Sequence, residues 1–263
     1  VVGAGNAAFC AALSAQEGGA KVLMLECAPK ELNGGNSRFT AGAIRFAYNG
    51  VNDLLEVMPD LSEEEVRTSD FGSYTEDQFF DDMFRVTEYR TDPDLCELLV
   101  KKSFSTIKWM REKGIRFVPI YGRQAFKIAG KFKFWGGLTV EAVGGGPGLI
   151  DDYTEIAKSK GIEIWYKARA LELMTSVNKI SGVRINKDGL LMEIKAQSVV
   201  IASGGFQASA EKRTRYLGPT WDLAKVRGTP FNTGDGIDMA LAVGASSAGN
   251  WSGCHAVGWD LNA

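Results

Sequence analysis

Runs of apolar residues along the chain alternate with amphipathic segments, a pattern that predicts strands joined by helices. The chain opens on a short apolar run at residues 1–2, which leads through glycines into an alanine-rich segment. That segment predicts a helix to about Gln16, ended by Gly18 and Gly19. The next run, residues 21–26, is apolar almost throughout, as buried parallel strands are. This order predicts an α/β fold that opens with a βαβ unit.

A helical region is predicted next, at about residues 50–115. Its charges are many, and its apolar residues recur at helical spacing, which predicts one buried face made of Leu95, Leu98, Leu99, Ile107 and Met110. Pro93 near a helix start and Gly114 near its end fit the usual positions of these residues. We therefore expect a helical insertion within the α/β fold.

The second half of the chain predicts a return to strands. Glycines crowd residues 131–148, which predicts loop and short strand. The elements expected after them are a helix at 151–160, a strand at 162–166, a strand pair at 170–174 and 180–185, a buried strand at 198–202, and a helix that follows 233–236 and ends near Gly244. The strand pair predicts a small antiparallel β meander before the buried strand.

Composition narrows the class of protein without deciding its function. The chain has 263 residues, 45% of them hydrophobic and 24% charged, with a net charge of −2, as in an ordinary soluble globular protein. It has no basic stripe of the kind that nucleic acid requires. It also has no apolar run long enough for a transmembrane segment. Because the chain opens inside a strand without an initiating Met, we expect it to be cut short at both ends.

Cysteine and histidine offer little chemistry of their own. The four cysteines form no CxxC pair and no zinc-like spacing, so we expect reduced thiols, a cytoplasmic location and no metal site. The single histidine, His255, excludes any mechanism that needs a histidine cluster within these residues.

The first turn carries the strongest motif, G-x-G-x-x-A at Gly3, Gly5 and Ala8. Its first glycine allows a tight turn, its second lets a pyrophosphate approach the backbone, and its small third residue lets helix and strand pack closely. Glu26 ends the next strand, at the distance where an acid accepts hydrogen bonds from a ribose. The motif therefore predicts dinucleotide binding. The alternative is an ordinary βαβ turn followed by a solvated glutamate.

Three further segments of small residues accompany this motif. Residues 34–37 and 40–43 are dense enough in them to suggest close approach of a bulky group, although a flexible loop is the alternative. Residues 203–205 end the predicted buried strand, where open α/β sheets bind ligands, although a plain strand-to-loop turn is the alternative. Asp235, in the last segment, either accepts from sugar hydroxyls or caps the following helix.

In this order the motifs resemble the FAD-dependent fumarate reductase and succinate dehydrogenase flavoprotein family. The resemblance is carried by residues 1–8, Glu26, 34–37, 202–206 and 233–236. Within the family, the Gly-Asn-Ala-Ala turn, Gly-Gly-Asn-Ser-Arg and residues 251–257 are most similar to the tricarballylate dehydrogenase branch. The resemblance implies a two-dinucleotide FAD-binding (Rossmann-like) parallel sheet. It also implies an FAD-binding domain at 1–250 and the start of a truncated substrate-capping domain at 251–263.

The family's FAD contacts transfer to matching positions of this chain. The implied cofactor-binding residues are Gly3, Gly5, Ala7, Ala8, Glu26, Gly35, Asn36, Ser37, Ala41, Gly42, Ala170, Ser203, Gly204 and Asp235. His255 would bind a substrate carboxylate. FAD would be held non-covalently, because no histidine lies between residues 30 and 50. The family's proton-transferring arginine would lie beyond Ala263, so no catalytic acid or base is assigned within the chain.

The implied reaction is hydride transfer between flavin and a carbon near a carboxylate, as in tricarballylate dehydrogenation. Two alternatives are also enzymes: one that runs the reaction in the reductive direction, as a fumarate reductase does, and one that acts on a substrate like that of a 3-ketosteroid dehydrogenase. An alternative of another class is a non-catalytic nucleotide-binding module. The implied partners are a small carboxylic acid and an electron-transfer protein or quinone, through which the protein could associate with a membrane.

Overall fold

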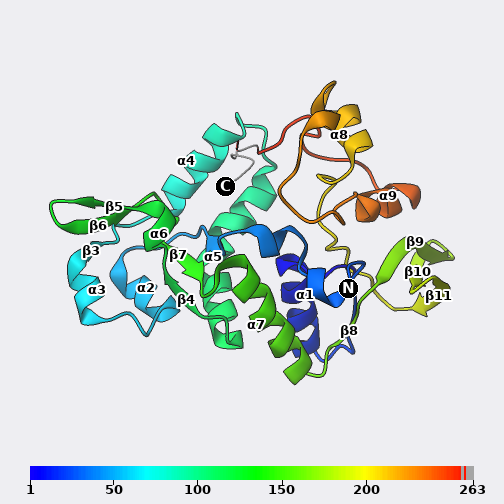
Figure 1. The fold of residues 1–263 in the computed structure, drawn as a ribbon, viewed down its shortest axis with the longest axis horizontal. Helices are drawn as coiled ribbons and strands as arrows, with labels where there is room; N and C mark the ends of the chain where they lie inside the picture. Colours follow the sequence, from blue (N-terminus) through cyan, green and yellow to red (C-terminus); the bar gives the residue numbers. More distant parts are fainter. Residues whose placement is uncertain (256–257, 259–263) are drawn as a thin grey trace.

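The structure, a computed structural model, describes residues 1–255 and 258, and its centre is a small parallel sheet (Figure 1). Strand β1 (Leu23–Leu25) pairs in parallel with β8 (Glu163–Trp165). Val2 forms parallel bridges to Leu25 on one side and to Ile201 on the other. Four chain segments therefore run side by side in the order expected for a βαβ opening.

One helix packs on this sheet, and a second helix packs against the first. Helix α1 (Asn6–Glu17) follows the first glycine turn and contacts both β1 and α7 (Gly145–Ser159). Phe9 of α1 stacks on Tyr153 of α7 with ring centroids 5.4 Å apart, and both rings are fully buried. This packing fixes the direction in which the N-terminus of α1 points.

An antiparallel meander lies at the other side of the sheet. It consists of β9 (Ala168–Ser176), β10 (Lys179–Lys187) and β11 (Leu190–Lys195). Its buried residues join Val2, Leu25 and Met239 of helix α9 (Asp235–Ala242) in a second, small core. The predicted α/β class, with a parallel sheet, a helical insertion and a β meander before residue 201, is confirmed.

The helical region contains α2 (Val51–Val57), α3 (Glu63–Thr68), α4 (Glu76–Val86) and α5 (Pro93–Lys113). The predicted buried face of α5 is wrong in its first half. Leu95, Leu98 and Leu99 are 66%, 56% and 48% exposed, whereas the buried residues of the helix are Cys96, Val100, Ile107 and Met110. The helix packs on α2 and α4 through a face rotated away from these leucines. The positions of the large apolar residues in the sequence therefore did not identify the buried face of the helix.

The exposed leucines of α5 give a direct test of this packing. We expect Leu98→Ala to change the free energy of unfolding by less than about 0.5 kcal/mol, because its side chain already contacts water. Val100→Ala should cost about 2 kcal/mol, because Val100 is 1% exposed and its removal leaves a cavity. Urea unfolding of both variants measures the difference. Equal losses would contradict the observed orientation of α5.

Short elements complete the fold. They are η1 (Lys30–Leu32), η2 (Gly35–Phe39), β2 (Ala43–Ile44), β3 (Ser69–Asp70), β4 (Phe117–Pro119), α6 (Tyr121–Gln124), β5 (Ala125–Ile128), β6 (Lys131–Phe134), β7 (Val140–Ala142), α8 (Ala210–Leu217) and η3 (Trp221–Leu223). Within the described residues, no helix is both long and apolar enough to cross a bilayer.

Two predicted elements differ from the structure. The glycine-rich stretch ends inside α7, which begins at Gly145 rather than at residue 151. A Cβ at Gly146 would lie 2.3 Å from the Ser37 carbonyl oxygen, so its glycine lets the first turn of α7 pack on η2. The buried strand predicted at 198–202 is reduced to the bridge at Ile201, and Val200 is 43% exposed.

Candidate functional site

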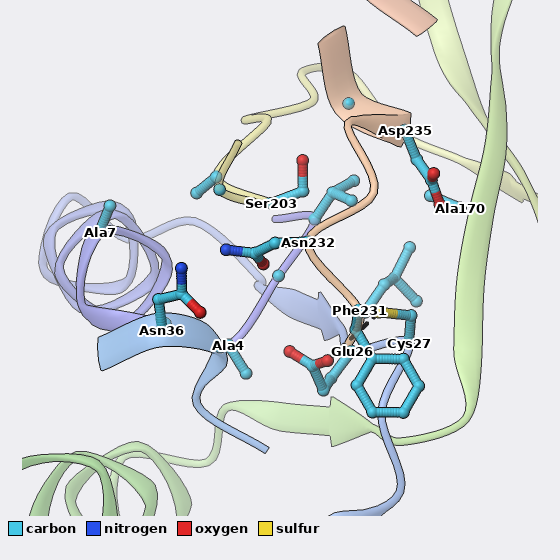
Figure 2. A pocket seen from close by; sticks show the side chains of 18 of the residues that line it. Ala4, Ala7, Glu26, Cys27, Asn36, Ala170, Ser203, Phe231, Asn232 and Asp235 are labelled. Carbon is cyan, nitrogen blue, oxygen red and sulfur yellow. Dashed lines mark hydrogen bonds between the residues drawn. The ribbon is translucent and has the colours of Figure 1, made fainter. Parts of the chain in front are cut away.

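A cavity lies where the first turn of the chain meets the ends of the neighbouring strand segments (Figure 2). Ala7 and Asn36 stand on one side of it, and Ala170 and Asp235 on the other. Its lining includes most of the residues predicted to bind cofactor, namely Gly3, Gly5, Ala7, Glu26, Gly35, Asn36, Ser37, Ala170, Ser203, Gly204 and Asp235. Six separate stretches of the chain therefore share one cleft.

The remaining predicted residues lie outside the lining of this cavity. Ala8 is fully buried in the core beside α7. Ala41 and Gly42 pack on the start of α7, since a Cβ at Gly42 would lie 2.7 Å from the Gly145 carbonyl carbon. His255 is exposed, and residues 256–257 and 259–263, which include most of the predicted capping segment, lie outside the described residues. The roles of these residues stay predictions.

The first turn can take only glycine at its start. Gly3 has φ +114°, and a Cβ there would lie 2.4 Å from the Ala202 carbonyl oxygen. The Gly3 amide donates to the Leu25 carbonyl at 2.8 Å, and the Ala202 amide donates to the Val2 carbonyl at 2.9 Å. The turn is thus closed between two parallel neighbours, and its backbone forms the floor of the cavity.

The N-terminus of α1 faces the cavity. The Asn6 amide donates to the Ser37 hydroxyl at 3.0 Å, while Gly5, Asn6 and Ala7 all line the cleft. The first amides of a helix have no partner within the helix, and they carry a partial positive charge. This wall therefore suits an anionic group such as a pyrophosphate.

Glu26 presents a buried carboxyl group to the same cavity. It is 5% exposed, and its Oε1 accepts from the Ala28 amide at 2.8 Å. Burial raises the pKa of Glu26, although hydrogen bonds from Ala28, Cys27 and Ala4 oppose the shift. Burial and the neighbouring carboxylate raise the pKa of the Cys27 thiol to about 12, so Cys27 is a neutral thiol near pH 7.

Asp235 starts α9 and is held by two side chains. Its Oδ2 accepts from Arg169 Nε at 2.7 Å, and its Oδ1 accepts from the Thr233 hydroxyl at 2.7 Å. Burial acts to raise the pKa of Asp235, but the bonds from Arg169 and Thr233 outweigh it, so this pKa lies below its usual value. Asp235 is therefore a carboxylate that ties α9 to strand β9 at the rim of the cavity.

We expect Arg169→Ala to loosen this rim. The variant should lose about 1 kcal/mol of stability, a small value because the pair is partly exposed to solvent. Since the pKa of Asp235 is lowered, this contribution is present above the ordinary Asp pKa of about 3.9 and disappears as pH falls through the lowered pKa. Urea unfolding at pH 7 and at acidic pH measures it.

Arg184→Ala provides the matched control for Arg169→Ala. Arg184 lies on the adjacent strand, is similarly exposed and pairs with Glu172 and Glu193 away from the cavity. Nucleotide affinity should fall in the Arg169 variant and stay unchanged in the Arg184 variant. If both variants bind nucleotide as the parent does, Arg169 has no part in shaping the cleft.

The loop that precedes α9, at residues 229–234, borders the cleft. Asn36 Oδ1 accepts from the Thr229 amide at 3.0 Å, so the loop is fastened to η2. The Asn232 side chain points into the cavity in Figure 2, and a Cβ at Gly204 would lie 2.7 Å from its Nδ2. Gly204 is thus glycine because Asn232 occupies the adjoining space.

Several lining residues were missed by the sequence interpretation, among them Cys27, Arg169, Phe231 and Asn232. Asn232 directly precedes the Thr-Gly-Asp-Gly segment, so extending that motif by one residue would have found it. Arg169 carried no signal, because a basic residue in an alternating strand is usually solvated.

A model of one protein family matches residues 1–254, and its description is FAD binding domain. The chain belongs to this family of FAD-binding domains. A probable fumarate reductase of Shewanella frigidimarina is 28% identical over 264 residues, which cover 97% of this chain and 40% of that protein. An NADH:fumarate oxidoreductase of Klebsiella pneumoniae is 25% identical, covering 94% of this chain and 24% of that protein.

Solved structures agree with this family. A flavocytochrome c3 fumarate reductase in its open conformation is similar with a TM-score of 0.73 at 26% identity, over 93% of this chain and 40% of that chain. A 3-ketosteroid-Δ4-(5α)-dehydrogenase from Rhodococcus jostii has a TM-score of 0.74 at 20% identity, covering 93% of this chain and 53% of that one, and shows a shared fold alone. The chain thus spans less than half the length of the curated relatives named here. The resemblance to fumarate reductase flavoproteins is confirmed, and the tricarballylate dehydrogenase branch stays a prediction.

Proposed function

We propose that this cleft holds the ADP half of FAD and that the whole protein is an FAD-dependent oxidoreductase acting on a CH–CH bond of a small carboxylic acid. The observation that carries the proposal is the meeting of three features in one cavity. These are the backbone floor at Gly3, the N-terminus of α1 that lines the cavity, and the buried carboxyl of Glu26. Pyrophosphate and ribose are the groups that such features bind.

The proposal gives the main side chains and backbone segments of the cleft separate parts in binding. The α1 amides near Ala7 would bind the pyrophosphate, Glu26 would accept from the adenosine ribose, and the backbone at Ala170 would contact the adenine. Asp235 would face the ribityl chain or the pyrophosphate. The segment with Asn36 and Ser37 would continue toward the flavin, which Ala41 and Gly42 would meet beyond the present cavity.

Bound FAD supplies the redox chemistry, by hydride exchange with a carbon near the substrate carboxylate. The relatives include proteins named fumarate reductase, NADH:acrylate oxidoreductase and urocanate reductase, which supports an unsaturated acid or its saturated form as substrate. Dehydrogenation of a tricarballylate-like acid is the finer proposal. His255 would bind a substrate carboxylate, and we place the start of the capping domain at 251–263, after an FAD-binding domain at 1–250.

The full-length protein tests this proposal in two steps. Purified protein should be yellow with a band near 450 nm, and acid precipitation should release all the flavin if it is bound non-covalently. The protein should then reduce an artificial electron acceptor with tricarballylate, or oxidise a reduced donor with fumarate. A colourless protein that takes up no FAD would overturn the cofactor assignment. If the protein bound flavin but turned over none of the acids, the alternative of a non-catalytic nucleotide-binding module would be favoured instead.

A further inference from the structure

The hairpin formed by β5 and β6 projects from the molecule far from the cleft (Figure 1). Its turn consists of Ala129 and Gly130, with φ +49° and +81°. Positive φ at both central residues gives a tight two-residue turn that follows the twist of the strands. The hairpin therefore ends in a narrow, convex tip.

The inner face of the hairpin is packed on the protein. Phe134 stacks on Phe71 with ring centroids 5.1 Å apart, and Phe132 contacts Tyr121 at 4.8 Å. Because directly paired residues of antiparallel strands share a face, these contacts also fix which residues face outward. The pairs Phe126 with Lys133 and Ile128 with Lys131 form the outer face.

The outer face combines large apolar side chains with lysines. Phe126 and Ile128 are 38% and 52% exposed, and Trp135, whose ring lies 5.3 Å from that of Phe126, is 62% exposed. Within the described residues, the side chains of Phe126, Ile128 and Trp135 are therefore not buried. Lys131 adjoins the tip and is exposed.

The charge of this segment is opposite to that of the chain. Residues 121–135 contain no Asp or Glu, and their basic residues are Arg123, Lys127, Lys131 and Lys133. Asp70 neutralises one of them, since it pairs with Lys133 at 2.9 Å. The hairpin keeps a net positive charge in a chain whose net charge is −2.

We propose that the tip of this hairpin docks peripherally on an anionic membrane surface. Ile128 and the Phe126–Trp135 pair enter the headgroup region, where aromatic side chains are favoured. Lys131 contacts lipid phosphate, with its alkyl stem along the apolar surface, while the other basic residues of the segment add to its positive charge. A convex tip suits a soft bilayer, whereas a protein partner would need a matching hollow.

Co-sedimentation of the full-length protein with vesicles tests the proposal. Binding is expected to vesicles of phosphatidylcholine with phosphatidylglycerol, to weaken as salt rises, and to be absent with phosphatidylcholine alone. Ile128→Glu and Lys131→Glu should each weaken binding about tenfold. Thermal unfolding followed by circular dichroism verifies that each variant is folded.

Matched controls come from the neighbouring meander. Leu190→Glu and Lys179→Glu change equivalent residue types in the turn regions of the β10–β11 and β9–β10 hairpins, and neither should alter binding. Lack of binding by the parent protein would overturn the proposal. So would a loss in Lys131→Glu without one in Ile128→Glu, because that outcome indicates contact with an acidic surface, such as a protein, without insertion.

Discussion

Gly3→Ala is expected to abolish FAD retention and to destabilise the protein by at least about 4 kcal/mol. The new Cβ would lie 2.4 Å from the Ala202 carbonyl oxygen, which is part of the backbone and cannot rotate away. Residues 2 and 202 would have to separate, and the Ala202–Val2 hydrogen bond of 2.9 Å would be lost with them. Flavin content after purification and urea unfolding both measure the effect.

Gly19→Ala separates this clash from the ordinary cost of positive φ. Gly19 has φ +83° at the end of α1, and nothing lies within 4 Å of its Cβ position. This control should lose only about 1 kcal/mol and keep its flavin. If Gly3→Ala retained FAD as well as Gly19→Ala does, the first turn would not be the floor of a cofactor site.

The cleft was the part of the molecule that sequence predicted best, because its constraints are local. A helix N-terminus beside a strand leaves room for a phosphate only if the turn between them is made of glycine. Gly3 and Gly5 therefore indicate the site in the sequence itself. Glu26 was found in the same way, since it ends the next strand. Two strands of the meander, β9 and β10, were predictable as well, whereas β11 was not predicted, because its side chains are almost all exposed and do not alternate.

Features that depend on packing between distant segments were not predictable. Which face of α5 is buried depends on α2 and α4, and Leu98 looks as apolar in sequence as Val100 does. The start of α7 at Gly145 depends on η2, whose carbonyls occupy the space that a side chain at Gly146 would take. Arg169 reaches the cavity rim only because α9 brings Asp235 to it, a contact across 66 residues.

Substitution of Glu26 is expected to weaken FAD binding strongly without the backbone clash that Gly3→Ala creates. Hydrogen bonds to a charged acceptor contribute about 1.5–3 kcal/mol each, so losing two ribose contacts in Glu26→Ala should weaken binding about a thousandfold. Glu26→Gln keeps an acceptor and loses the charge, so its loss should be smaller. Fluorescence titration of the apoprotein with FAD measures both, and Glu163→Gln, an exposed residue of β8, is the control.

The pH dependence distinguishes a cofactor contact from a structural role. Burial raises the pKa of Glu26 in the folded apoprotein, so ionising its carboxyl group lowers the stability of the fold. This contribution to stability is fully present below the pKa of Glu in the unfolded chain, about 4.3, and is lost as pH rises through the raised pKa of the folded state. Ribose hydroxyls that donate to the carboxylate favour its ionised form, so FAD should bind more tightly as pH rises through the same range. Glu26→Gln should remove both trends and leave the apoprotein at least as stable as the parent near pH 7. A variant that keeps the parent's affinity and its pH dependence would show that Glu26 does not contact the cofactor, since unfolding could not account for that result.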